Sequence, residues 1–281
     1  MRNFSYFCNE EIEELAIGKF DGVHLGHQRL LQELGSFGGV LIITQNPQKK
    51  SDGALSNLSW RQTWIKQKVF FLEFEAIKEW SGEEFLCFLK EHFKKLKKLV
   101  VGYDFCFGRA RQYTSRDLCH LFDGDVVIVP EVIEKGIPVH TQKIKELLLL
   151  GELSLANLLL GRDYQIQGAV IKGQGLGRKS LYPTFNLRVQ NYVIPKDGVY
   201  AGYVQDGEDR IACAIFVGVR STDGAFSIEV HLLEKFREFG HMTLQFRERI
   251  RDNLSFANLK DLKKQITQDL QNIKNILKLD S

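Results

Sequence analysis

Two histidines three positions apart, His24 and His27, follow a glycine-rich segment in the stretch "GKFDGVHLGHQ". The glycines Gly18, Gly22 and Gly26 allow the backbone to turn sharply and to come close to a ligand. A helix that begins at such a turn aims its free N–H groups at an anion. Imidazoles beside those amides can donate hydrogen bonds to phosphoryl oxygens as charge builds up during group transfer. The stretch therefore predicts a phosphate site.

Two other interpretations of these histidines remain open. One of the two could simply cap the helix, or the pair could contribute to a metal site. The metal interpretation is weaker, because no carboxylate or cysteine is placed to complete a zinc site with two histidines. The full F-D-G-x-H-x-G-H string favours function over a helix cap.

The elements that must position this stretch alternate between short apolar runs and helical patterns. The runs "ELAIGKF", "GVLIIT", "KKLVVGYDF" and "DVVIVPEV" are typical of strands. Helices are expected from about His27, through Trp60 to Lys95, and in "HTQKIKELLLLGELSLANLLLG". Buried strands separated by helices predict a Rossmann-like parallel α/β sheet that is covered on both faces. Ligands of such sheets bind at the carboxyl ends of strands, where the histidine stretch lies.

The pattern changes near Gly161. Stretches such as "YQIQGAVIKG", "GVYAGYVQ", "RIACAIFVG" and "HMTLQFRERI" alternate in polarity, and turns rich in Gly, Asp and Pro join them. They predict an antiparallel β-barrel or sandwich. Apolar residues at helical spacing from Asn258 to about Lys278 predict a terminal helix. We therefore expect two domains, residues 1–160 and 161–281, each long enough to bury its own core.

The composition is that of an ordinary globular protein. A net charge of +3 over 281 residues is too small to argue for a nucleic-acid partner. The five cysteines are odd in number and scattered, with no C-x-x-C pair, so we expect neither a disulfide framework nor a zinc site. No apolar run has the length of a signal peptide core or a membrane span. These features predict a cytoplasmic protein, with no membrane partner and no obligate protein partner indicated.

The histidine stretch resembles the H-x-G-H signature of the nucleotidyltransferase superfamily, and it is most similar to the FMN adenylyltransferase module of prokaryotic FAD synthetases. "LVVGYDFCFGRARQ" resembles the V-G-x-D-F-x-F-G motif of that module, and "GRKSLYPTFNL" resembles the P-T-x-N motif of riboflavin kinase. "FSIEVHLL" and "FRERIRD" also fall where that kinase has them. The resemblance covers nearly the whole chain in the right order. It implies a nucleotidyltransferase-like domain and a riboflavin-kinase-like barrel, which make FMN and then FAD from riboflavin and ATP.

In the first domain, the resemblance implies that the FMN phosphate attacks the α-phosphorus of ATP in line and expels magnesium pyrophosphate. It assigns His24 and His27 to the ATP phosphates as catalytic residues. Asp104 and Phe105 could line the same cleft, or they could simply form a turn at a strand end. The cofactor-binding residues that it implies here are Gly18, Phe20, Asp21, Gly26, Asp104, Phe105 and Thr141.

In the second domain, phosphorylation of riboflavin needs a Mg²⁺ site, a phosphate cradle and a base. The resemblance assigns Thr184 and Asn186 to Mg²⁺ and the ATP phosphates, and Glu229 to the base. It also assigns a phosphate-covering flap to the "KGQGLGRK" loop and a flavin phosphate contact to Arg251. The flap residues that it implies are Gly173, Gly175, Gly177 and Arg178.

Each of these kinase assignments has a structural alternative. Thr184 and Asn186 could form a turn after Pro183. Glu229 could point into solvent from an edge strand, and the glycine pattern could be a mobile hairpin. Arg251 could form a surface ion pair with Asp252 or Glu248.

The chain departs from the family pattern at several positions. "HTQKIK" replaces a Ser/Thr-rich phosphate-binding stretch: Thr141 keeps a hydroxyl, while Lys143 and Lys145 stand near the expected arginines and offer charge without the bidentate fork. Leu181 replaces a glycine, and Phe216 stands where relatives often have asparagine. The "HTQKIK" change predicts a slow or differently tuned adenylyltransferase, while the changes at Leu181 and Phe216 leave the local loop geometry of the kinase domain open.

Three alternatives to a two-step enzyme therefore stay open. The chain could be a riboflavin kinase with a degenerate or weak adenylyltransferase domain. The H-x-G-H domain alone could be a cytidylyl or pantetheine-phosphate transferase, although the kinase-like half has no role there. A non-catalytic flavin- or nucleotide-binding regulator would not need Glu229.

Overall fold

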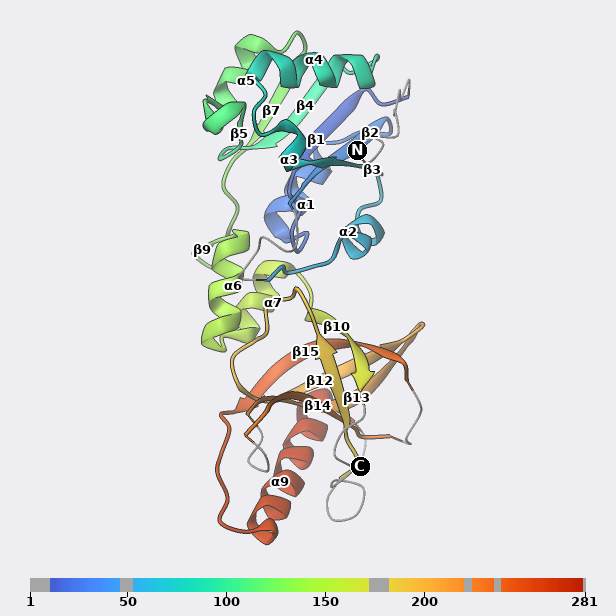
Figure 1. The fold of residues 1–281 in the computed structure, drawn as a ribbon, viewed down its shortest axis with the longest axis vertical. Helices are drawn as coiled ribbons and strands as arrows, with labels where there is room; N and C mark the ends of the chain where they lie inside the picture. The colour runs from blue at the N-terminus through green and yellow to red at the C-terminus, as the bar shows by residue number, and fades with distance from the viewer. Residues whose placement is uncertain (1–10, 46–52, 172–181, 220–223, 235–238, 280–281) are drawn as a thin grey trace. The chain divides into compact units, whose positions relative to one another are not determined.

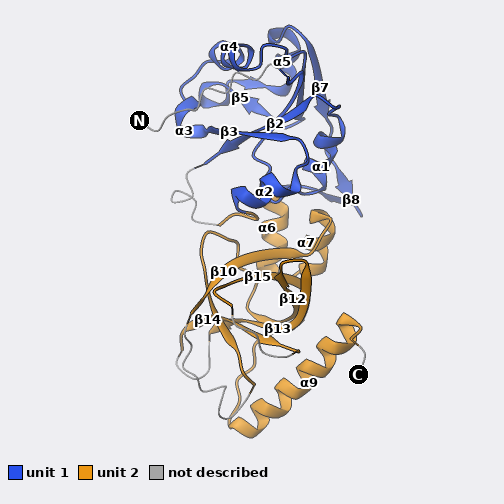
Figure 2. Ribbon diagram, turned by 90° about the vertical axis from the view of Figure 1, so that its right-hand side faces the viewer, with its two compact units in different colours: residues 1–51, 57–140 blue, residues 52–56, 141–281 orange. Residues whose placement is uncertain are grey.

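The computed structural model describes residues 11–45, 53–171, 182–219, 224–234 and 239–279. The chain packs as two compact units, which Figure 2 shows in blue and orange. Unit 1 comprises Met1–Ser51 and Asn57–His140, and unit 2 comprises Asp52–Ser56 and Thr141–Ser281. Each unit has its own sheet and its own core, as the sequence predicts.

Unit 1 is built on a five-stranded parallel sheet in the order β3-β2-β1-β4-β7 (Figure 1). Its strands are β1 (Glu14–Gly18), β2 (Gly38–Thr44), β3 (Lys68–Glu73), β4 (Lys98–Gly102) and β7 (Asp125–Val129). The strand order reverses between β1 and β4, which lie side by side at the centre of the sheet. In open parallel sheets, the ligand crevice lies beyond the carboxyl ends of the strands at this reversal point.

Helices cover both faces of this sheet, because alternate residues of each strand point to opposite faces. On β1, Leu15 and Ile17 join the core under α4 (Gly82–His92) and α5 (Ser115–Leu121). Ala16 joins the other core, to which α1 and α2 contribute. The remaining elements of unit 1 are α1 (Leu25–Gln32), α2 (Leu58–Trp64), α3 (Phe74–Ile77), the 3-10 turn η2 (Arg109–Arg111), and the short strands β5 (Cys106–Phe107), β6 (Tyr113–Thr114), β8 (Ile133–Glu134) and β9 (Ile137–Pro138).

One predicted segment of unit 1 is wrong. The sequence predicts helices through Trp60 to Lys95, but β3 lies within that span and pairs with β2 at the edge of the sheet. β3 has only two fully buried side chains, Phe70 and Leu72. Such a short edge strand has too few apolar positions to stand out from the helical patterns on either side.

Unit 2 is a closed antiparallel barrel, which decides between the barrel and the sandwich left open by the sequence. The strand order around it is β10-β11-β14-β13-β12-β15. The strands are β10 (Tyr164–Ile171), β11 (Phe185–Val189), β12 (Gly198–Asp206), β13 (Asp209–Val219), β14 (Phe226–Leu232) and β15 (His241–Arg251). None of the helices in the described ranges combines the length and the low polarity needed to cross a membrane.

The predicted terminal helix is α9 (Leu259–Leu277), and Asn258 caps its first turn by accepting a hydrogen bond from the Asp261 N–H at 2.9 Å. Ile273 and Leu277 are buried against Ala201 and other small residues of the barrel. The apolar stripe that predicted the helix therefore packs on the outside of the barrel.

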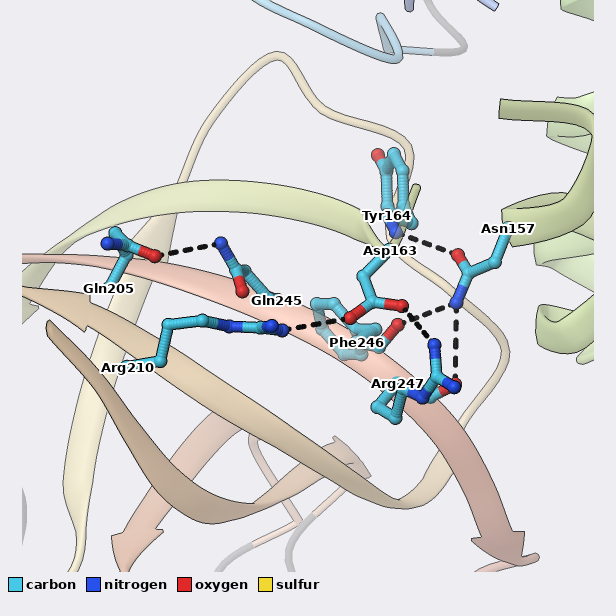
Figure 3. Close-up of polar contacts among 8 residues, drawn as sticks. All are labelled: Asn157, Asp163, Tyr164, Gln205, Arg210, Gln245, Phe246 and Arg247. Atoms are coloured by element: carbon cyan, nitrogen blue, oxygen red, sulfur yellow. Dashed lines mark hydrogen bonds and ion pairs between the residues drawn. The ribbon is translucent and has the colours of Figure 1, made fainter. Parts of the chain in front are cut away.

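Two helices before the barrel, α6 (Thr141–Leu150) and α7 (Leu153–Leu160), pack with unit 2. The Asn157 side chain ties α7 to the barrel, as Figure 3 shows. Its Nδ2 donates to the Phe246 carbonyl at 2.9 Å, and its Oδ1 accepts from the Tyr164 N–H at 2.7 Å. By packing, the division therefore falls after His140, whereas the sequence places the domain boundary between residues 160 and 161.

Candidate functional sites

The glycine-rich turn follows β1 directly and lies at the reversal point of the sheet. Phe20 and Val23 have φ angles of 49° and 40°, and Gly22 between them has 81°. A positive φ at a non-glycine residue costs on the order of 1–3 kcal/mol, and such residues cluster at functional sites. The absence of a side chain at Gly18 lets the Phe20 ring pack close to its backbone, because a Cβ there would lie 3.2 Å from that ring.

His24 is the N-cap of α1, so the helix-cap interpretation is correct for this residue. Its Nδ1 accepts from the His27 backbone N–H at 3.4 Å. A neutral imidazole that accepts at Nδ1 carries its proton on Nε2. The cap therefore makes the Nε2 of the buried His24 a donor, which is the role that a phosphate oxygen requires.

His27 stacks on His24, with ring centroids 3.7 Å apart, and its ring centroid also lies 5.0 Å from that of Phe20. Gly26 permits this arrangement, because a Cβ there would lie 3.2 Å from both the His24 ring and the Val139 carbonyl oxygen. The structure thus brings His24, His27, Phe20 and Gly26 together at the start of one helix.

Asp21 forms a buried ion pair that the sequence did not predict. Its Oδ1 lies 2.7 Å from Nη2 of Arg61, and the two side chains are 2% and 8% exposed. Arg61 also donates from Nη1 to the Lys19 carbonyl at 2.9 Å. Burial lowers the pKa of Arg61, while the Asp21 carboxylate opposes that change. Arg61 on α2 therefore fixes the strained turn at two points.

Asp104 and Phe105 follow β4, the strand beside β1. The Phe105 N–H donates to the Gly102 carbonyl at 3.0 Å, which is the contact of a turn former. The Phe105 ring packs against the core on the α4 side, with its centroid 5.9 Å from that of Phe107. Asp104 is exposed. A place for these residues in the nucleotide cleft stays a prediction.

A second group of titratable side chains lies after the neighbouring strands β4 and β7. Tyr103 donates from its hydroxyl to Glu131 Oε1 at 2.8 Å, and His140 Nε2 lies 2.8 Å from the same oxygen. Desolvation and the hydrogen bond to Glu131 raise the pKa of Tyr103 to about 12. The hydrogen bonds from His140 and Tyr103 lower the pKa of Glu131. No sequence motif points to this group, because its members come from three separate segments.

The residues of the "HTQKIK" stretch belong to α6 in unit 2 from Thr141 onward. Lys145 is buried, and its ammonium donates to the Gly53 carbonyl at 2.6 Å. Lys143 is paired with Glu146 at 3.1 Å. Phosphate binding by Thr141, and by the two lysines, stays a prediction.

In unit 2, neighbouring strands bring Asn186 and Glu229 together. The two residues are directly paired between β11 and β14, and Phe216 on β13 pairs with Glu229 from the other side. Ser227 Oγ lies 3.1 Å from both Asn186 Oδ1 and Glu229 Oε1. β14 is an interior strand of the closed barrel, and Glu229 is half-buried. The edge-strand interpretation of Glu229 is therefore wrong, while its role as the base stays a prediction.

The other predicted kinase residues are Thr184 and the residues of the flap. Thr184 is exposed and lies directly before β11. Gly173, Gly175, Gly177 and Arg178 of the flap lie outside the described residues, as does Leu181.

Arg251 is held by a residue that the sequence did not suggest. Its Nε and Nη2 donate to the Asp269 carboxylate of α9 at 2.9 and 2.6 Å. The alternative of an ion pair with Asp252 or Glu248 is wrong: the Asp252 carboxylate pairs with Arg249 at 2.7 Å, and Arg251 Nη1 donates to the Asp252 backbone carbonyl at 2.8 Å. Asp269 is nearly fully buried, so Arg251 anchors α9 to the end of β15. Its contact with a flavin phosphate stays a prediction.

The parallel sheet with its histidine turn and the barrel with its Asn–Ser–Glu group define a class: a nucleotidyltransferase domain followed by a flavokinase domain. Comparison with family models agrees with this class. The model described as FAD synthetase matches residues 9–143, and the model described as riboflavin kinase matches residues 160–277.

Relatives that match over most of the chain define the family more closely. The bifunctional riboflavin kinase/FMN adenylyltransferase of Escherichia coli K12 is 31% identical, covering 91% of this chain and 90% of its own. The protein of the same name from Haemophilus influenzae is 31% identical, covering 92% of each. The chain belongs to the family of bifunctional riboflavin kinase/FMN adenylyltransferases.

A solved structure shares the whole fold. It is the crystal structure of a Streptococcus pneumoniae protein described as a macrolide-efflux protein, with a TM-score of 0.87, 25% identity and 98% coverage of both chains.

Proposed function

We propose that this protein makes FMN from riboflavin and ATP in unit 2, and FAD from FMN and a second ATP in unit 1. The observation that carries this proposal is the presence of two separate chemical groups in the order of the two family matches: the histidine turn after β1, and the Asn186–Ser227–Glu229 group on the barrel. A protein with only one of these activities would not need both groups.

In the adenylyl transfer, an oxygen of the FMN phosphate attacks the α-phosphorus of ATP, the new P–O bond forms, and the bond to pyrophosphate breaks. No protein nucleophile is needed, so the residues supply position and charge stabilisation. We assign this role to the Nε2 donor of His24, to His27 stacked upon it, and to the N-terminal amides of α1. Asp21, held by Arg61, keeps the turn in the conformation that presents these groups.

In the kinase step, the terminal ribityl hydroxyl of riboflavin attacks the γ-phosphorus of ATP, and ADP leaves. Glu229 accepts the hydroxyl proton as the general base. Thr184 and Asn186 offer a hydroxyl and an amide oxygen, which are ligands of the kind that Mg²⁺ takes. Bound there, Mg²⁺ would neutralise the charge of the phosphates.

We further propose that the protein acts in the cytoplasm on these small molecules, without a nucleic-acid, membrane or obligate protein partner. The support for the compartment is the state of the cysteines. Within the described residues, Cys87, Cys106, Cys119 and Cys213 are all free thiols. Free thiols persist in a reducing compartment.

Chromatographic analysis of the purified protein with riboflavin, ATP and Mg²⁺ tests the proposal, with two variants that serve as controls for each other. His27→Ala should lower FAD formation by about a hundredfold to a thousandfold and leave FMN formation unchanged. Glu229→Gln should lower FMN formation by about a hundredfold and leave the conversion of added FMN to FAD unchanged. Equal loss of both activities in either variant would contradict two separate sites.

A riboflavin kinase with a weak adenylyltransferase is the second candidate. The buried Lys145 favours it, because its ammonium is used by the Gly53 carbonyl. FMN that accumulates without FAD in the same assay would identify this alternative. Binding of both substrates without turnover would identify a regulator.

A further inference from the structure

Ser227 lies between the two residues that we assign to Mg²⁺ and to proton transfer. It precedes Glu229 by two positions on β14, so both side chains lie on the same face of the strand. Its Oγ is 3.1 Å from Glu229 Oε1 and 3.1 Å from Asn186 Oδ1 on the neighbouring strand. Ser227 and Asn186 are only 7% and 8% exposed, so these contacts form away from bulk water.

The number of protons in this group determines how its hydrogen bonds can run. A serine hydroxyl carries one proton and can donate to one acceptor at a time. The Glu229 carboxylate is a stronger acceptor than the Asn186 amide oxygen, because hydrogen bonds to an ionised acceptor are about twice as strong as neutral ones. The Ser227 proton therefore belongs to Glu229.

This assignment has a consequence for Asn186. If Ser227 donates its proton to Glu229, its Oγ can only accept from a third group. An Asn186 amide oxygen facing it would then place two hydrogen-bond acceptors in contact in a buried environment, which is unfavourable. The oxygen and nitrogen of an amide side chain are assigned from their hydrogen bonds, so the amide can be turned. With the amide turned, Asn186 Nδ2 donates to Ser227 Oγ, and Asn186 Oδ1 is directed away from Ser227.

We propose that Ser227 is the positioning residue of the kinase site, through the directed chain Asn186 Nδ2–H to Ser227 Oγ–H to Glu229 Oε1. The chain sets the amide oxygen of Asn186 to face outward as a metal or phosphate ligand, and it orients the carboxylate of Glu229 to receive the proton from riboflavin. This inference rests on the proposed kinase function. It adds a residue that touches neither the substrate nor the metal and acts through two residues that do.

Residues that orient metal ligands typically change affinity or activity by about 10- to 100-fold when they are replaced. Ser227→Ala removes the hydroxyl and disconnects both partners. We expect kcat for FMN formation to fall by about 10- to 100-fold and the Mg²⁺ requirement to rise. The KM for riboflavin should stay the same, because Ser227 does not contact riboflavin. Ser227→Thr keeps the hydroxyl and should restore most of the rate.

The experiment measures steady-state FMN formation by Ser227→Ala and Ser227→Thr over a range of Mg²⁺ concentrations. Ser255→Ala, the same change in an exposed loop, is the matched control. An unchanged kcat in Ser227→Ala would overturn the proposal. A Ser227→Thr protein as slow as Ser227→Ala would also overturn it, because the site would then need the size of serine and not its proton.

Two further measurements distinguish failure of the Ser227 proposal from failure of the kinase function on which it rests. Glu229→Gln in the same assay tests the base assignment: if it kept full turnover, Glu229 would not be the base and the Ser227 proposal would fail with it. A parent protein that forms no FMN would instead refute the proposed kinase function. If Ser227→Ala does not fold, Ser227→Cys replaces it, since a thiol is a weak donor of similar size. Its kcat should lie between those of the parent and Glu229→Gln, and a parental kcat would overturn the proposal.

Discussion

Replacement of Arg61 by methionine tests the most deeply buried ion pair of the candidate sites. Methionine keeps an unbranched apolar stem and removes the charged guanidinium, so Asp21, which is 2% exposed, would lose its partner. Removal of one partner from a buried ion pair typically destabilises a protein by about 3–5 kcal/mol. The strained residues Phe20 and Val23 lie in the same turn, so we expect Arg61→Met at the upper end of that range.

Tryptophan fluorescence can measure the loss of stability in Arg61→Met. Its three tryptophans, Trp60, Trp64 and Trp80, all lie in unit 1, so tryptophan fluorescence during denaturant unfolding reports on that unit. FAD formation should fall with the stability of the turn, while FMN formation by the barrel serves as an internal control. Arg29→Met is the matched variant, because Arg29 pairs with Glu33 on the surface and such pairs contribute at most about 1 kcal/mol.

A double variant makes the test stricter. Asp21→Asn combined with Arg61→Met leaves no uncompensated buried charge, so it should recover part of the stability that Arg61→Met loses. If Arg61→Met unfolded at the same denaturant concentration as the parent, or if the two changes were simply additive, the reasoning about the ion pair would be refuted.

Two further predictions concern other paired groups. Asp269→Asn removes the charged partner of Arg251. The free energy of unfolding of the barrel, followed by circular dichroism, should fall by about 1.5–3 kcal/mol. A simultaneous shift of the unfolding transition seen by tryptophan fluorescence, which reports on unit 1, would contradict a local effect. Tyr103 has a pKa raised to about 12, so its neutral form stabilises the folded state below the ordinary tyrosine pKa of about 10, and that contribution is lost as the pH rises towards 12. Ultraviolet titration of the Tyr103→Phe variant should lack one tyrosine ionisation near pH 12 that the parent protein shows. If the variant instead lacked an ionisation near pH 10, the raised pKa of Tyr103 would be disproved.

The parts of the fold that the sequence predicted are those with strong local patterns. The continuous apolar runs of β1, β2 and β4 indicate strands buried on both faces, and the alternation in β10 to β15 indicates an antiparallel sheet. The strand β3 was missed because its outer face is exposed at the sheet edge. Closure of the barrel was left open because periodicity describes each strand by itself and not the pairing of β10 with β15.

The contacts that fix the sites were not predictable in the same way. Arg61 and Asp21 are far apart in the chain, as are Arg251 and Asp269, and neither pair follows a helical or strand spacing. Motifs identify groups that carry chemistry, because that chemistry demands particular residue types. The groups that orient them can be any residue with a suitable charge or proton, so they become visible only when distant segments are brought together.

His24 shows that a structural and a chemical role can depend on each other. The sequence set helix capping against phosphate binding as alternatives, and the structure has the histidine in the capping position. The cap uses Nδ1 as an acceptor and so fixes the proton on Nε2. A capping Ser or Asp would satisfy the same backbone N–H but would not present an imidazole donor at the helix start. The cap therefore does not weaken the phosphate assignment: it sets the tautomer that a donor to a phosphoryl oxygen needs.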